Sequence, residues 1–484
     1  MKCKLLLSMI LIILISFSIS YSQKVSHPSQ LKFKPLKFEP PDPLDYRIQL
    51  NNGMIIYIKE DHKLPLFQLN AYIRAGSIYD PKDKIGLAEL TGSLMRTGGT
   101  KNMSGDEIDE TLDFIAANIN IYVSKFYTTA SISSMAKDID EVLKIYADIL
   151  MNPVFDEQKI KLRKEEVIDA IKRRNDNPRT IVANEFNRLL YKNHPLSWLP
   201  SLKTINNISR EDMVEFHRRY FAPNNMIIAI ASDFNKGELL QKIKRVFSGW
   251  NKKEINFPVL PDVDINIKPG VYMIQKNINQ GFIRFGHFGV RLNNPDIYAL
   301  RIMNFILGGG SFTSRITTTV RSNEGLSYSQ GSRMGEGTIF PGLFYCYVQT
   351  KSSTVPYAIY LILKHVREMT EELVLDSEME TARNTLIERF PEFFSTAFTT
   401  MNNFAKLEFN QQPFDYYKKY RDRIKNVTKE DVLRVAKKYL HPDNMIFLIV
   451  GDIEKCKAGG SKYKGSLEDF GKVNIIQLES SVRK

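Results

Sequence analysis

The sequence predicts an α+β protein built from two homologous domains, and three observations support this prediction. The chain has 484 residues, of which 43% are hydrophobic, so it is too long for one core and too apolar for a disordered chain. A segment of the first half recurs in the second half. Strand-like alternation and helix-like spacing of apolar residues follow one another in both halves.

The internal repeat joins residues 208–234 to residues 427–453. The two segments align without gaps at an offset of 219, and nine positions are identical. These include the pairs Glu211/Glu430, Asp212/Asp431, Tyr220/Tyr439, Pro223/Pro442 and Asn225/Asn444. Each copy predicts a capped amphipathic helix, a proline-containing turn and a buried strand. We therefore expect homologous domains at 45–250 and 271–484, with a proline-punctuated linker at 251–270 between them.

Strands and helices are expected to alternate within each domain. Ser104 and Glu107 form the capping-box pattern of a helix that carries Ile108 and Leu112. The other expected elements of the first domain are a strand at 67–74, a helix at 86–95, a β-rich run at 119–133 and a helix at 139–150. Those of the second are a strand at 281–290, a helix at 296–307, and strands near Tyr328 and at 344–350. Each domain should form an antiparallel-rich sheet with helices packed on one side.

The first residues have the features of an export signal. Lys4 precedes an apolar run from Leu5 to Ile19 that is shorter than a membrane helix requires, and small residues stand at its end. We expect a signal peptide at 1–22 and an N-terminal extension at 23–44. The mature protein would then be periplasmic or secreted, without stable membrane insertion. The alternative is an uncleaved membrane anchor.

Cysteines and charge exclude several classes of protein. Only Cys346 and Cys456 remain beyond the leader, too few for a disulfide framework, and the sequence leaves open whether they pair. The net charge of +13 comes from scattered lysines, which predicts a solvated surface, although a basic face would attract acidic peptides or anionic lipids. No nucleic-acid-binding motif is present, so we expect no nucleic-acid partner.

The segment from Gly86 to Thr100 resembles the M16 (insulinase/pitrilysin-like, mitochondrial processing peptidase-like) peptidase family. In that family a helix of the first domain carries H-x-x-E-H ahead of a Gly-Thr turn. The resemblance covers residues 45 to 455 and implies a metalloenzyme LuxS/M16 peptidase-like fold, in which each chain is half of a clamshell. In this frame Glu89 and Ser93 occupy the two histidine positions and Gly92 that of the general-base glutamate. Ala170, beside Asp169, occupies the position of the third metal ligand.

These residues do not make a catalytic zinc site. Such a site needs three side chains with N, S or O donors. Glycine and alanine offer none, serine is a weak neutral donor, and no carboxylate at Gly92 remains to take a proton from water. The seven histidines include no pair at i, i+4 spacing: His27, His62, His194, His217, His287, His365 and His441. We expect no metal or other cofactor on this chain, and zinc on a partner chain.

The second domain carries a different signature. Residues 304–315 and 320–329 resemble the family's C-terminal-domain motif, in which an arginine and a tyrosine seven residues apart reach the other half's zinc site. The resemblance implies that Arg321 binds the substrate backbone and that Tyr328 donates to the developing oxyanion. The alternative is a solvated helix end for Arg321 and a half-buried strand residue for Tyr328. The glycine-rich loop Gly308, Gly309, Gly310 lacks a following lysine, so we expect a helix-ending turn with positive φ beside a peptide chamber.

Three function hypotheses follow. The first is a non-catalytic, substrate-binding subunit of a heterodimeric zinc metalloendopeptidase acting on exported peptides, whose partner carries H-x-x-E-H. The second is a structural or binding protein of peptidase ancestry, and the third an autonomous zinc peptidase with unusual ligands. By the family resemblance, an extended peptide would add to the edge strand that carries Ile119, Ile121 and Val123.

Overall fold

Two six-stranded sheets form the framework of the protein. A computed structural model describes residues 37–462 and 465–478, so the expected signal peptide lies outside the described residues. The chain divides into residues 1–39 and residues 40–484, and both sheets belong to the second unit. Within the described ranges, no helix combines the length and apolar character needed to cross a bilayer.

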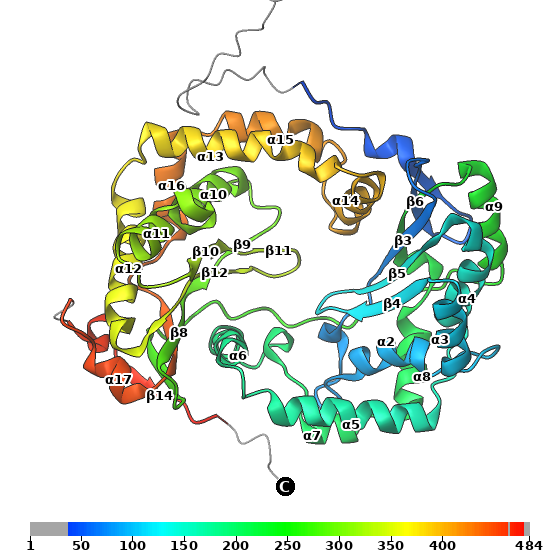
Figure 1. Ribbon diagram of the computed structural model, residues 1–484, viewed down its shortest axis with the longest axis horizontal. Coiled ribbons are helices and arrows are strands. Elements are labelled where there is room, and N and C mark those ends of the chain that lie inside the picture. The colour runs from blue at the N-terminus through cyan, green and yellow to red at the C-terminus, as the bar shows by residue number, and fades with distance from the viewer. Residues whose placement is uncertain (1–36, 463–464, 479–484) are drawn as a thin grey trace, which may run out of the picture. The chain divides into compact units, whose positions relative to one another are not determined.

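The first sheet has the strand order β1-β2-β6-β3-β5-β4 (Figure 1). Its strands are β1 Arg47–Gln49, β2 Ile55–Glu60, β3 Leu66–Ile73, β4 Asn118–Val123, β5 Thr128–Met135 and β6 Met226–Ser232. The pair β2 and β6 is parallel, and the other pairs are antiparallel. The β-rich run at 119–133 is therefore a hairpin of two strands, and its first strand, β4, lies at the sheet edge.

The helices whose positions were predicted in the first half begin close to those positions; they are α2 Leu87–Thr97, α3 Gly105–Phe114, α4 Ile139–Met151 and α8 Arg210–Tyr220. The structure adds α5 Glu157–Arg173, α6 Pro178–Tyr191, α7 Leu202–Asn206 and α9 Lys236–Val246. The predicted capping box is confirmed: the Ser104 side chain accepts from the Glu107 backbone N–H, and Glu107 accepts from that of Ser104.

The second sheet has the order β10-β12-β8-β13-β7-β14. Its strands are β7 Gly270–Gln275, β8 Gln280–Phe288, β10 Ser329–Met334, β12 Leu343–Lys351, β13 Ile446–Gly451 and β14 Val473–Ile475, and a small sheet pairs β9 Val290–Arg291 with β11 Glu336–Gly337. Its helices are α10 Ile297–Asn304, α11 Arg315–Thr317, α12 Val355–Glu371, α13 Asp376–Glu388, α14 Ala397–Phe409, α15 Tyr416–Lys425, α16 Lys429–Tyr439 and α17 Ile453–Ala458.

The structure confirms the internal repeat. The repeated strand is β6 in one sheet and β13 in the other, and both stand at the same place in the strand order. The repeated helices α8 and α16 both start with a capping box, formed by Ser209 with Asp212 and by Thr428 with Asp431. Both copies therefore use the same local chemistry to place a helix ahead of a central strand.

Each sheet exchanges one helix with the other half. Helix α14 packs on β2, β3 and β6 of the first sheet, and α6 packs on β8 and β13 of the second. Figure 1 shows α14 on the opposite face of the first sheet from α4 and α9. The first residues of the exchanged helices, Pro178 and Ala397, are separated by the same offset of 219 as the repeat. The expectation of helices on one side is thus incomplete, because the helix on the other face comes from elsewhere in the chain.

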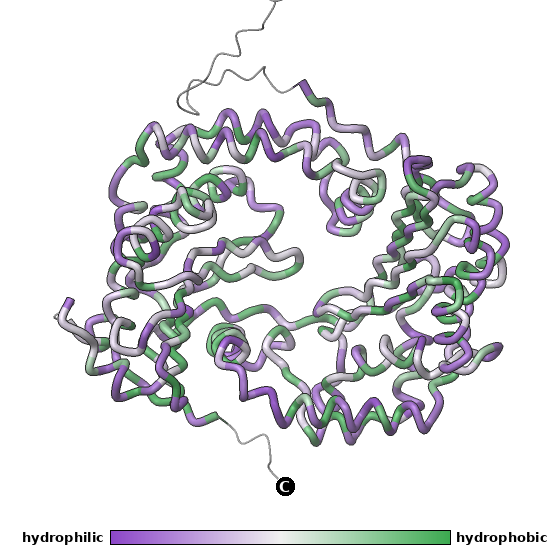
Figure 2. The backbone as a smooth tube through the Cα atoms, viewed as in Figure 1, coloured by the Kyte–Doolittle hydropathy of each residue, from purple (hydrophilic) through white to green (hydrophobic). Residues whose placement is uncertain are grey.

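The contact of α6 with the second sheet is apolar. In Figure 2 the hydrophobic colour is concentrated on the strands of the sheets. One buried cluster joins Ile181, Val182, Phe186 and Leu190 of α6 to Ile274, Leu343, Ile446, Leu448 and Val450. Each large apolar side chain that is fully buried contributes about 1.5–3 kcal/mol, so this cluster stabilises the contact between the halves.

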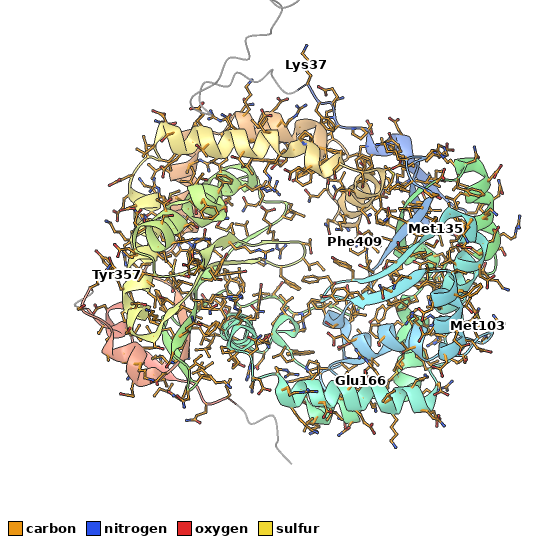
Figure 3. All side chains as sticks on the ribbon, in the orientation of Figure 1. Lys37, Met103, Met135, Glu166, Tyr357 and Phe409 are labelled. Atoms are coloured by element: carbon orange, nitrogen blue, oxygen red, sulfur yellow. The ribbon has the colours of Figure 1, made fainter. Side chains whose placement is uncertain are left out.

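The contact of α14 with the first sheet also has a polar part. Asn402 Oδ1 accepts from Asn70 Nδ2 and from the Tyr72 hydroxyl, both at 2.8 Å. Glu408 accepts from Arg47 through two N–H groups at 2.8 and 2.9 Å, and from the Tyr57 hydroxyl at 2.5 Å. Figure 3 shows Phe409 at the end of α14 facing this sheet. Because hydrogen bonds are directional, these contacts fix the position of α14 on the sheet and also contribute to holding it there.

We expect Glu408→Ala to lower the free energy of unfolding by about 2–3 kcal/mol, because Arg47 and the Tyr57 hydroxyl would lose their shared acceptor in a largely buried place. Urea unfolding measures the change. The control is Glu392→Ala, which removes an exposed pair with Arg389 and should cost less than about 0.5 kcal/mol. Equal effects of the two substitutions would mean that the exchanged helix does not depend on this contact.

Candidate functional site

Helix α2, which carries most of the degenerate zinc positions, is held at its first turn by a buried carboxylate. Asp80 accepts from the backbone N–H of Gly86 at 2.8 Å and of Ala88 at 2.9 Å. Burial raises the pKa of Asp80 to about 7, and the two backbone hydrogen bonds oppose this shift. Gly86 has φ +107°, a conformation that favours glycine. The position at which α2 begins is therefore fixed by Asp80 and Gly86, which are not among the residues at the zinc-motif positions.

The structure leaves no room for a side chain at the general-base position. A Cβ on Gly92 would lie 2.5 Å from Val123 Cγ2 and 3.4 Å from Ile121 Cγ2. Glu89 is exposed and Ser93 is half-buried on the same helix. The apolar side chains of β4 thus pack against the turn of α2 where an active member would carry its base.

The residue at the position of the third metal ligand also has no side-chain donor atom. Ala170 lies on α5, which packs against α2, and its side chain is exposed. The neighbouring Asp169 is exposed too and pairs with Lys172 at 3.2 Å. The four positions therefore fall on two adjacent helices, as the resemblance implies, and offer one strong ligand between them.

Two cations lie near Glu89. Burial lowers the pKa of Lys125 and of Arg174; the carboxylates of Asp80 and Glu89 oppose the shift for Lys125, and that of Glu89 opposes it for Arg174. Lys125 donates to the carbonyl of Trp198 at 3.3 Å, and Arg174 donates to that of Pro200 at 2.5 Å. Fixed positive charge near the one carboxylate opposes the binding of a dication.

These residues do not fit a zinc ion, because they lack donors, space and negative charge. Across residues 37–462 and 465–478, no group of three or more His, Cys, Asp or Glu side chains could hold a metal ion. Cys346 and Cys456 are both free and buried, so the bridge that the sequence left open is not formed. His287 is buried and His217 is half-buried, and each has a backbone carbonyl within 2.9 Å of a ring nitrogen. These two histidines therefore contribute to the packing of the fold.

Strand β4 has the position that peptide addition requires. It pairs only with β5, so its other edge has no strand partner in the part of the chain that the structure describes. Ile119 is fully buried, and Ile121 and Val123 are partly buried against the first-domain core. Tyr122 points to the opposite face and is 68% exposed. The apolar residues of β4 are thus used internally, and an added peptide would meet the backbone edge.

Arg321 and Tyr328 come together on the surface of the second half. The guanidinium carbon of Arg321 lies 5.2 Å from the centre of the Tyr328 ring and 4.6 Å from that of Phe312. Tyr328 is 87% exposed and Phe312 is 62% exposed. No carboxylate pairs with Arg321 among the described residues. The alternative of a half-buried Tyr328 inside a strand is wrong, because Tyr328 directly precedes β10 and faces solvent.

Phe312 is a member of this cluster that the sequence analysis missed. We define the cation–aromatic cluster as Phe312, Arg321 and Tyr328. Two aromatic faces against one guanidinium orient it and leave its N–H groups at the rim of the stack. The only local signal was an aromatic residue two positions after the triple glycine.

The loop before β10 holds Tyr328 in place. The backbone N–H of Leu326 donates to the carbonyl of Val320 at 2.9 Å, and the Thr350 hydroxyl donates to the carbonyl of Leu326 at 3.0 Å. The N–H of Ser329 donates to the Ser327 hydroxyl at 2.9 Å. The tyrosine is therefore exposed on a loop that is anchored on both sides.

The glycine-rich loop is a helix-ending turn, as predicted, but its conformation differs from the prediction. A Cβ on Gly308 would lie 2.4 Å from the backbone nitrogen of Ser332, so close approach of β10 requires glycine there. None of the three glycines has positive φ: Gly310 has φ −85°, and Ser311 takes the left-handed conformation at φ 52°. The reason is that a π-type turn, Phe305–Gly309, ends the helix and the Gly310 N–H still donates to the Phe305 carbonyl.

We expect Gly92→Glu to lower the free energy of unfolding by about 2–4 kcal/mol, because the new side chain would displace Val123 and bring a carboxylate into the core. Val123→Ala in the same chain should recover part of this loss, as a double-mutant cycle would show. The control is Ala170→Glu at an exposed position, expected to be nearly neutral. A folded Gly92→Glu variant of unchanged stability would contradict the packing described for α2.

Comparisons with known proteins agree with this architecture. The family model "Insulinase (Peptidase family M16)" matches residues 56–199, and "Peptidase M16 inactive domain" matches residues 207–386. An uncharacterized zinc protease of Rickettsia bellii is 25% identical over 346 residues, which cover 70% of this chain and 81% of that protein. The non-peptidase homolog YmxG of Helicobacter pylori is 22% identical over 407 residues, which cover 83% of this chain and 93% of the relative.

A solved structure shares the fold. The crystal structure of a peptidase M16 inactive domain from Pseudomonas fluorescens superposes with a TM-score of 0.76 at 21% identity, covering 84% of this chain and 97% of that one. The two matched models together span more than half of the sequence. With the paired α+β halves, the degenerate first motif and the arginine–tyrosine pair, these matches establish that the chain belongs to peptidase family M16.

Proposed function

We propose that this chain is the non-catalytic, substrate-binding subunit of a heterodimeric zinc metalloendopeptidase. Zinc and the H-x-x-E-H motif would belong to the partner subunit. The observation that carries the proposal is the cation–aromatic cluster: Tyr328 is exposed, Arg321 is half-buried, and neither side chain has a carboxylate or hydrogen-bond partner among the described residues. Polar groups held ready on the surface without a partner are suited to a ligand.

Each residue of the pair has a distinct role in this proposal. Arg321 donates charge-assisted hydrogen bonds to carbonyl groups of the bound peptide, and stacking on Phe312 limits the entropy lost on binding. The Tyr328 hydroxyl donates to the oxygen that becomes negative when the scissile carbonyl is attacked. The peptide itself would lie along the free edge of β4 by strand addition.

A structural or binding protein without proteolysis is the second candidate. The observation in its favour is the tight packing at Gly92, together with the description of the Helicobacter pylori relative as a non-peptidase homolog. In that case the complex would contain no zinc motif. A partner that co-purifies with this chain and carries H-x-x-E-H favours the first candidate, and one that lacks the motif favours the second.

We further propose that the protein is exported and works on exported peptides. The support is the apolar run from Leu5 to Ile19 after Lys4, ending in small residues. N-terminal sequencing of the native protein would find a start near Gln23 if the leader is removed.

We expect Tyr328→Phe in the assembled complex to lower kcat by roughly 100-fold at nearly constant KM, because the lost hydrogen bond acts mainly in the transition state. Arg321→Ala should lower kcat and raise KM, since the guanidinium binds the ground state and the transition state alike. Steady-state kinetics on the reconstituted pair measure both effects.

The matched control for Arg321→Ala is Arg245→Ala on α9, an exposed arginine on a helix of the first half. This control should retain wild-type kinetics. Wild-type rates for Tyr328→Phe and Arg321→Ala, at unchanged melting temperature, would remove the case for a role in catalysis.

A further inference from the structure

A second site lies in the first half, beside the degenerate zinc positions. A pocket of about 570 Å³ is bordered by the end of α5, one face of α6 and the segment 193–203. This volume lies in the range of small-ligand sites. Neither the family motif nor the cation–aromatic cluster contributes a residue to it.

The pocket is strongly basic. Its ionisable lining residues are five cations, Lys82, Arg174, Arg188, Lys192 and Lys203, and one carboxylate, Glu185. Arg188 pairs with Glu185 at 3.2 Å, and Lys192 pairs with Asp264 at 2.5 Å.

The other three cations have no carboxylate within ion-pair distance among the described residues. Arg174 is half-buried, and one of its N–H groups is used on a backbone carbonyl. Positive charges exceed negative charges around this cavity, so an anion that enters it is attracted.

The remaining lining favours a peptide carboxylate over a bare inorganic anion. The side-chain amides of Asn175, Asn184 and Asn193 border the pocket. Amides offer both donors and acceptors, which match a peptide backbone, whereas a phosphate accepts only. The indole of Trp198 adds an apolar wall for the aliphatic part of a side chain.

The pocket also stands next to the path proposed for the peptide. Lys125, in the hairpin that follows β4, donates to the carbonyl of Trp198 in the pocket wall. Lys125 comes two residues after the end of β4, and Trp198 lines the pocket. A peptide added to the edge of β4 would therefore pass close to the pocket at that end of the strand.

We propose that this pocket binds an acidic side chain of the extended peptide and makes the protein selective for acidic peptides. The inference rests on the proposed function for the position of the peptide on β4. Binding itself requires neither the partner subunit nor catalysis, so it can be measured on the isolated chain.

The test compares two labelled ten-residue peptides by fluorescence anisotropy. One contains a Glu-Glu pair in a neutral sequence, and the other has Gln-Gln at the same place. We expect the acidic peptide to bind more tightly, and added salt to weaken it. Lys82→Gln with Lys203→Gln should weaken the acidic peptide about tenfold and leave the amide peptide unchanged, since each exposed charge contributes a few-fold.

The control is Lys144→Gln with Lys437→Gln, two exposed lysines outside the pocket that change the net charge equally. Equal affinity for the two peptides, or equal weakening by the two double variants, would overturn the proposal. Displacement of the acidic peptide by millimolar inorganic phosphate, where acetate has no effect, would overturn the assignment to a carboxylate.

Hydrogen exchange of residues 118–123 separates this proposal from the proposed function. Slower exchange of β4 on binding of the acidic peptide supports both. Selective binding with unchanged exchange in β4 supports the pocket and contradicts strand addition. If Tyr328→Phe is without effect in the complex while charge-selective binding persists, the catalytic role fails and the pocket stands.

Discussion

Helices α6 and α14 each cover the sheet of the opposite half, and this exchange joins the two halves of the protein. A sheet has two faces, and each half of this chain supplies outer helices for only one of them. The other face is covered by a helix of the opposite half, through an apolar cluster at α6 and through Asn402 and Glu408 at α14. Neither half would bury both faces alone, so the two halves are expected to fold as one cooperative unit. The edge strands are β1 and β4 in the first sheet and β10 and β14 in the second, and β4 is the edge on which the peptide is proposed to bind.

The same framework explains how the chemistry of one motif was lost without loss of fold. Helix α2 is fixed by Asp80 at its start and by packing on β4 and α5, and none of these contacts needs a metal ligand. Gly92 lets β4 approach the helix more closely than any larger residue would. Lys125 and Arg174 then place positive charge near Glu89, and Arg174 also borders the basic pocket.

Much of the fold could be predicted because its signals are local. Capping residues such as Ser104 and Glu107, and the repeat with its turn at Pro223 and Pro442, act within a few residues of where they stand. The helix exchange could not be predicted, because an apolar helix face does not specify which sheet it meets. Arg321 and Tyr328 were found through family resemblance, whereas Phe312 joins them only through tertiary contact. The prediction of positive φ in the triple glycine was wrong, because a π-type turn ends the helix and the left-handed conformation falls on Ser311 instead.

The assignment of zinc to the partner subunit is tested by measuring zinc content and peptide cleavage on the purified mature chain alone and on the complex isolated with its native partner. We expect the chain alone to contain no stoichiometric zinc and to cleave no peptide, because its family positions supply one strong ligand, Glu89. In the complex, zinc should be stoichiometric with the partner and cleavage should appear. Stoichiometric zinc in the isolated chain, with cleavage abolished by Glu89→Ala, would show that this chain carries its own catalytic zinc site.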